Sequence, residues 1–181
     1  IETKGDTTTK AFTESGGAII AKNVKIQSHT NQDIDVDADG AVGGIVAVGF
    51  MAPIATVINN NSVEIGRNTQ ISAQENVSVS AVSETNTYAV GTGAGGGAVA
   101  VLAANTKLDV TDTTSSQINL GANIVAGQSL LAEAKTTSHA LALALSSAGG
   151  LGVGADAQAN TTYICTNSCS LCTFPLLRIQ P

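Results

Sequence analysis

Hydrophobic and polar residues alternate with a period of two along most of the chain. Val77, Val79 and Ala81 alternate with serines in NVSVSAVS, and leucine alternates with alanine in 141–145. Apolar residues alternate with aspartate in 33–39 (DIDVDAD). This alternation predicts β-strands with one buried face, because an amphipathic helix would repeat every 3.6 residues. Glycine pairs and the asparagine cluster at 59–61 interrupt the pattern, so we expect many strands separated by turns.

The predicted strands recur with a period of 53 residues, and two landmarks share this spacing. A strand start, clearest in NVKIQSHT and NVSVSAVS, lies at 23–30, 76–83 and, more loosely, 129–136. A glycine pair lies at 43–44, 96–97 and 149–150. A strand that buries one face needs stacked copies to cover it. The repeat therefore predicts an all-β fold, a parallel β-helix or β-solenoid built from about three 53-residue repeats. The spacing leaves open whether each repeat forms one wide coil or two or three smaller ones.

The repeat also divides the chain into segments. We expect 1–22 to be the end of a preceding repeat, 23–75 to be repeat 1, 76–128 repeat 2, 129–163 a partial repeat 3, and 164–181 an irregular Cys-containing tail. The chain then represents a section of a longer array, whose export signal would lie elsewhere.

The composition agrees with a thin interior. The chain has no Trp, three Phe and two Tyr, with 43% hydrophobic and 12% charged residues and a mean hydropathy of +0.22. Low charge and positive hydropathy exclude a disordered chain. The scarcity of aromatic residues excludes a core built around bulky rings. We expect ladders of Val, Ile, Leu and Ala at the inward positions.

The charge balance limits the partners. Eight basic and 14 acidic residues give a net charge of -6, and four of the eight basic residues lie in the first 25 positions. Phosphate neutralisation needs clustered Lys and Arg. We therefore expect no nucleic-acid partner.

Membrane insertion is an alternative to the β-solenoid, because the chain contains three uncharged stretches, 40–63, 85–106 and 136–155. Residues 40–58 are numerous enough to cross a bilayer as a helix, and each stretch contains glycines four positions apart, a spacing that lets membrane helices pack closely. Aromatic belts and flanking Lys or Arg are missing, however. Buried solenoid strands also need no charge. We therefore keep membrane insertion as the disfavoured alternative.

One candidate metal site is visible. Asp35, Asp37, Asp39 and Gly40 reproduce the opening D-x-D-x-D-G of a calcium-binding loop, but Val46 stands where the bidentate Glu is needed. Alternation also places these aspartates on one face of a strand, which makes a solvated acidic face the simpler explanation. A single weak calcium site remains the alternative, and no other metal site is expected.

Two further motifs resemble cofactor sites. Residues 91–96, GTGAGG, match a dinucleotide fingerprint, but the next residues alternate like a strand where a helix is needed. Cys165, Cys169 and Cys172 have the CxxxCxxC spacing of radical SAM iron-sulfur enzymes, but only nine residues follow Cys172. We expect no cofactor, and pairing of two of the three cysteines is left open.

No catalytic residues can be assigned. His29 and His139 lie in no triad or metal motif, and we expect them at the surface or in turns. A polysaccharide-cleaving β-helix usually needs clustered Asp, Arg or Lys, and the only arginines are Arg67 and Arg178. We therefore expect the protein not to be an enzyme.

The order of motifs within each repeat resembles that of leukotoxin-type filamentous adhesins, large exported surface proteins of Gram-negative bacteria. The likeness covers about residues 16–162: an Asn-Val-x-Val strand, a Gly-rich centre, an Ala-Val-Ala-Val strand and a Gly-Ala-Asn-Ile turn. The resemblance implies export to the cell surface, a β-helical stalk, and adhesion or toxicity towards host cells. It implies a host cell-surface protein or glycan, together with neighbouring repeats of the same chain, as partners.

Three functions follow as hypotheses. The first is a non-catalytic structural or adhesive segment of an extracellular or surface-displayed adhesin or leukotoxin. The alternatives are a membrane-inserting toxin segment that uses the uncharged stretches, and a polysaccharide-cleaving β-helix.

Overall fold

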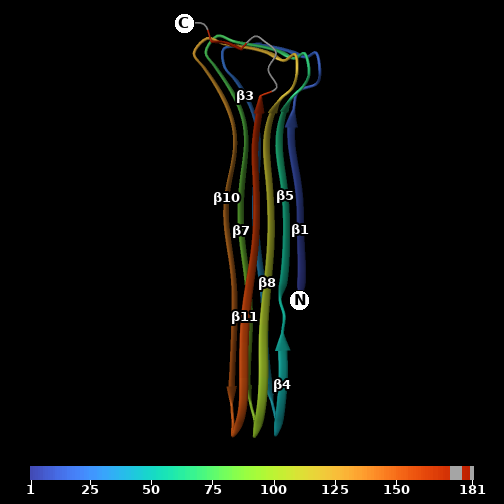
Figure 1. Ribbon diagram of the computed structural model, residues 1–181, viewed down its shortest axis with the longest axis vertical. Helices are drawn as coiled ribbons and strands as arrows, with labels where there is room; N and C mark the ends of the chain where they lie inside the picture. The colour runs from blue at the N-terminus through green and yellow to red at the C-terminus, as the bar shows by residue number, and fades with distance from the viewer. Residues whose placement is uncertain (172–176, 180–181) are drawn as a thin grey trace.

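The computed structural model describes residues 1–171 and 177–179, and every regular element in them is a β-strand. The long strands run side by side along the longest axis of the molecule, and short strands lie at one end (Figure 1). The predicted all-β fold is therefore confirmed. The strands are β1 (Glu2–Phe12), β2 (Ala18–Ala21), β3 (Val24–Gly43), β4 (Val46–Met51), β5 (Ile54–Ile65), β6 (Gln70–Ala73), β7 (Asn76–Gly96), β8 (Val99–Ile118), β9 (Asn123–Ala126), β10 (Ser129–Gly149), β11 (Gly152–Leu171) and β12 (Leu177–Ile179).

The strands form three parallel sheets. We call them sheet A (order β1-β5-β8-β11, with β4 also on β8), sheet B (β12-β9-β6-β2) and sheet C (β10-β7-β3). Every strand pairs with the equivalent strand of the next repeat, and all the pairs are parallel. This is the architecture of a parallel β-solenoid.

The pairing register answers the question that the sequence left open. Val24 pairs with Val77 and Val99 pairs with Gly152, so the partners are 53 residues apart. Each repeat is therefore one wide coil rather than two or three small ones. Within a coil the chain follows a long strand of sheet C, turns back along a long strand of sheet A and crosses a short strand of sheet B. From Val24 onward, residues 53 apart in these strands are neighbours on adjacent coils.

The first coil is one residue shorter than the next at the corner between sheets B and C. Ala21 pairs with Ala73, 52 residues on, whereas Val24 pairs with Val77. The shorter corner has no carbonyl for the amide of Asn76, and the side chain of Asn23 takes its place. Its Oδ1 accepts the Asn76 backbone N–H at 3.1 Å.

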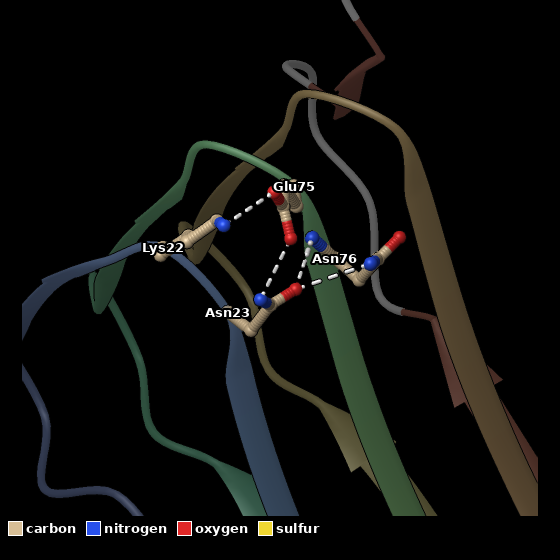
Figure 2. Close-up of polar contacts among 4 residues, drawn as sticks. All are labelled: Lys22, Asn23, Glu75 and Asn76. Atoms are coloured by element: carbon tan, nitrogen blue, oxygen red, sulfur yellow. Dashed lines mark hydrogen bonds and ion pairs between the residues drawn. The ribbon is translucent and has the colours of Figure 1, made fainter.

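Further polar contacts surround this corner (Figure 2). Asn23 Nδ2 donates to Glu75 Oε2 at 2.9 Å, and Lys22 Nζ lies 3.0 Å from Glu75 Oε1. Ser129, the equivalent of Asn76 in the next coil, donates its hydroxyl to Asn76 Oδ1 at 2.7 Å. The corner is thus held by a row of polar side chains along the stack.

Glycine pairs turn the chain at the other end, which we call the tip (residues 43–46, 96–99 and 149–152). The tip turns stack so closely that a Cβ added to Gly97 would collide with the carbonyl oxygen of Gly44. Gly44 and Gly150 also have φ values of 147° and 153°, which disfavour any other residue. The glycine pairs therefore serve both turning and close stacking.

Sheets A and C face each other and enclose the core. The alternating residues are largely β-branched or small, which suits strands with one buried face. One cluster lies near the corner and includes Val63, Ile65 and Val79. A second lies further along the strands and includes Val57 and Leu108. The described aromatic residues are all exposed to solvent to a substantial degree, as a thin interior requires: Phe12, Phe50, Tyr88 and Tyr163.

The prediction of an irregular tail from residue 164 is wrong as far as Leu171. Ile164–Leu171 continue β11 and pair with Thr111–Ile118 in the same 53-residue register. Parallel pairing joins backbone groups, so the change of composition does not interrupt it. Cys172 lies outside the described residues.

Candidate functional site

The outer face of sheet C carries a row of polar side chains that cross three coils. Asp33 on β3, Asn86 on β7 and His139 on β10 are register partners, and all three are exposed. Two residues further along each strand, on the same face, lie Asp35, Tyr88 and Leu141. The 53-residue period thus gathers side chains that are far apart in the sequence.

These two rows border an open depression of about 500 Å³. It is lined by residues of all three strands of the sheet: Asp33, Asn86, Thr87, Tyr88, Ser138, His139, Ala140 and Leu141. Tyr88, in the central strand, is 38% exposed, so part of its ring is available to a ligand. We call this depression, with its two rows, the sheet C site.

The sheet C site is suited to binding. Carboxylate, amide and imidazole groups offer both donors and acceptors of hydrogen bonds, and the tyrosine ring adds an apolar face with a polar tip. Asp33 and His139 are two strands apart, about 10 Å, so they do not form an acid–base pair. The arrangement can hold a polar ligand with an apolar face.

The aspartates of the calcium-like motif also lie on the outer face of β3. Asp35, Asp37 and Asp39 are exposed, and Val36 and Ala38 between them are buried. Successive carboxylates on one strand face are about 7 Å apart. Within residues 1–171 and 177–179 no three His, Cys, Asp or Glu side chains gather closely enough to hold a metal ion.

The remaining predicted chemical residues are dispersed. His29 is exposed on β3 outside the sheet C site, and Arg67 is exposed in the turn between β5 and β6. The fingerprint-like residues 91–96 belong to β7 and no helix follows them. Cys165 and Cys169 lie four residues apart on one strand, about 13 Å, which is too far for a disulfide between them.

A polar band inside the solenoid was missed at the sequence level. It crosses the core between the two apolar clusters, where the prediction placed only aliphatic ladders. Its buried members come from the two repeats 23–75 and 76–128: Ser28, Thr30, Asn59, Asn61, Ser83, Thr85, Thr87, Asp112, Thr114 and Ser116. The signal was available, because period-two alternation puts Asn59 and Asn61 in phase with the buried Val57 and Val63.

The uncharged stretches meet at the tip. There they fold as strands and turns, and apolar side chains are exposed, including Ile45 at 83% and Leu151 at 98%. Val48 and Phe50 extend this exposed apolar surface along β4. No helix suited to crossing a bilayer occurs among the residues that the structure describes.

The chain matches no known family model, no curated protein and no solved structure. Function must therefore be inferred from the residues and their arrangement.

Proposed function

We propose that this protein is a non-catalytic, adhesive segment of a large exported surface protein of the leukotoxin-type filamentous adhesin class. The observation that carries this proposal is the 53-residue register, which builds rows of outward side chains from successive coils. In solenoids the extended surface made by stacked repeats is the usual place of binding. The wide, thin coil provides such a surface on both long sheets.

We place binding at the sheet C site, with a host cell-surface glycan or glycoprotein as the ligand. Sugar hydroxyls would exchange hydrogen bonds with Asp33, Asn86 and His139, and an apolar sugar face would lie on Tyr88. These groups are exposed and already aligned by the sheet. A pre-formed site avoids the entropy cost of ordering loops on binding.

The test compares binding of the wild-type chain and variants to host cells and to an immobilised glycan panel. Tyr88→Ala and His139→Ala should each weaken binding at least about tenfold, roughly the loss of one good contact. His29→Ala is the matched control, because His29 is exposed on the outer face of the same sheet but lies outside the depression. Equal binding by all three variants and the wild type would reject the sheet C site.

The tip favours a second candidate function, docking on a lipid surface. Its side chains are apolar and exposed, and the nearest charged residues on the strands that lead to it are acidic, Asp39 and Asp156. Such a tip would suit a zwitterionic bilayer better than an anionic one. Docking would be shallow, because the unpaired edges of the outermost strands are costly in hydrocarbon.

Flotation with phosphatidylcholine vesicles distinguishes this function from adhesion. Docking predicts that the wild type floats and that the double variant Ile45→Ser/Leu151→Ser does not. Ile20→Ser, a change of an exposed residue at the opposite end of the molecule, is the control. A wild-type chain that stays in the unbound fraction would exclude docking and leave the adhesive proposal unaffected.

A further inference from the structure

Asn59 has an unusual environment in the polar band. The side chain of its neighbour Asn61 is fully engaged: its Oδ1 accepts the Ser28 hydroxyl and its Nδ2 donates to the carbonyl oxygens of Ser28 and Val82. Asn59 Oδ1 has no hydrogen-bond donor, although the residue is 0% exposed. Asn59 Nδ2 donates to two hydroxyls, Ser83 Oγ at 2.7 Å and Thr85 Oγ1 at 3.2 Å, rather than to carbonyls.

One of these hydroxyls belongs to Thr85, which lies across the core on β7. Thr85 Oγ1 is 3.2 Å from Asn59 Nδ2 and donates its own proton to Asp112 Oδ1 at 2.9 Å. Asn59, Thr85 and Asp112 are all 0% exposed. A carboxylate, a hydroxyl and a primary amide are therefore linked in a row by hydrogen bonds, in a site without access to bulk solvent. This is the order of a general base, a nucleophile and an electrophile.

We propose that Asn59 and Thr85 react with each other to form an intramolecular ester that covalently joins sheets A and C. Thr85 Oγ1 attacks Asn59 Cγ while Asp112 takes the hydroxyl proton. The tetrahedral intermediate then expels the amide nitrogen, to which Asp112 returns the proton. The Thr85 O–H and Asn59 C–N bonds break, a C–O bond forms, and one ammonia molecule leaves. No oxidant, reductant or other reactant is needed.

The surroundings of Asp112 suit the role of base. Its second oxygen, Oδ2, accepts a hydrogen bond from Tyr163 Oη at 3.4 Å, which holds the carboxylate in place. Burial raises the pKa of Tyr163 to about 12, so the phenol keeps its proton and remains a donor at neutral pH.

Burial also favours persistence of the product. An ester in water hydrolyses, whereas a site that excludes water protects it. The link would join β5 to β7 and close the chain between residues 59 and 85, so the two sheets could not separate at this level without breaking a covalent bond. In a surface stalk under load, such a bond would oppose forced unfolding.

Mass spectrometry of the purified, folded full chain tests the proposal. Trypsin cleaves after Lys25, Arg67 and Lys107, which places Asn59 and Thr85 on different peptides, 26–67 and 68–107. The ester predicts a linked pair of these peptides, lighter than their sum by one ammonia molecule, and their separation by alkaline hydroxylamine. Two unlinked peptides of full mass would overturn the proposal. Loss of ammonia that fragmentation places on Asn59 within an unlinked peptide 26–67 would also overturn it, because this marks a succinimide at Asn59.

Variants test the roles of Thr85 as the nucleophile and Asp112 as the base. Thr85→Val and Asp112→Asn should abolish the linked peptide and restore the full mass. Thr87→Val is the matched control, since Thr87 is buried on the same strand with an unpaired hydroxyl but contacts neither Asn59 nor Asp112 through a hydrogen bond. A linked peptide that persists in Thr85→Val would show that another nucleophile reacts and would reject this assignment. The wild-type result does not depend on the folding of any variant.

Discussion

Polar side chains that repeat along the stack support the backbone where the repeat is irregular. Asn23 replaces a missing carbonyl at the short corner, and its partner Asn76 continues the row to Ser129. Equivalent positions of successive coils thus cooperate even where their residues differ.

The first prediction concerns this corner. Asn23→Ala removes the acceptor for the Asn76 N–H, and we expect the free energy of unfolding to fall by about 1 kcal/mol, the usual worth of one hydrogen bond. Chemical denaturation of the variant and the wild type measures this difference in the free energy of unfolding. Asn31→Ala, a change of an exposed residue on β3, the strand that follows Asn23, should cost clearly less. Equal losses in the two variants would show that the Asn23 contacts contribute nothing.

The second prediction concerns Glu64 on the outer face of sheet A. Hydrogen bonds from Lys10 Nζ and Asn119 Nδ2, both at 2.6 Å, hold the pKa of Glu64 below its usual value. The unfolded chain then binds more protons than the folded one as the pH falls past the ordinary carboxyl range. The stabilisation is present above the unfolded pKa and is lost as the pH falls through the lower, folded pKa.

Denaturation curves between pH 7 and about pH 3 test this pH-dependent stabilisation by Glu64. Glu64→Gln should unfold with a weaker dependence on pH than the wild type. Glu84→Gln, an exposed substitution on β7, should keep the wild-type dependence. A pH profile of Glu64→Gln that superimposes on the wild type would contradict the role of this ion pair.

At the scale of elements, the long strands and the tip turns were predictable, and the interior was not. Alternation in residues 33–39 correctly placed the aspartates outside and Ile34, Val36 and Ala38 towards the core. The glycine pairs correctly marked the turns. The polar band was missed because the asparagine cluster at 59–61 has the composition of a turn, and only Val, Ile, Leu and Ala were expected at the inward positions. Inside a stack most of these side chains find hydrogen-bond partners on other strands, although the hydroxyls of Thr30 and Thr87 have none. Burial of the paired groups therefore costs less than it would in isolation.

The sheet C site could not be predicted from local motifs. Asp33, Asn86 and His139 belong to different repeats and form no pattern within any one of them. Only the register of one coil per repeat brings them into a row. The same register carries the chain through residues 164–171, where the unusual composition suggested an irregular tail.

The tip turns give an element-scale prediction. Gly97→Ala directs a methyl group against the carbonyl oxygen of Gly44 in the neighbouring coil, so the turns must move apart. We expect a loss of about 2 kcal/mol or more in unfolding free energy. Gly149→Ala is the control, because nothing lies within 4 Å of its added methyl group. Equal unfolding free energies of the two variants would contradict the role of Gly97 in close stacking of the tip turns.

At the scale of the whole molecule, stability and binding surface both come from the stacking of wide coils. Each coil contributes a long strand to each of two facing sheets, so the core is thin across the sheets and long in the strand direction (Figure 1). This geometry explains why so few aromatic residues are needed. It also places the corner, the sheet C site and the uncharged tip at different positions along one elongated body.

The most direct test of the register is disulfide trapping in a background with Cys165, Cys169 and Cys172 replaced by serine. Thr92 and Leu145 are register partners on the outer face of sheet C. Adjacent strands place their Cα atoms about 5 Å apart, which is within disulfide range. Mild oxidation of the folded Thr92→Cys/Leu145→Cys variant should therefore give an internal disulfide, seen as a shift on a non-reducing gel. Thr92→Cys/Ser146→Cys should give none, because the second side chain points to the opposite face. Failure of the first pair to link, or equal linking of both pairs, would contradict one coil per 53 residues.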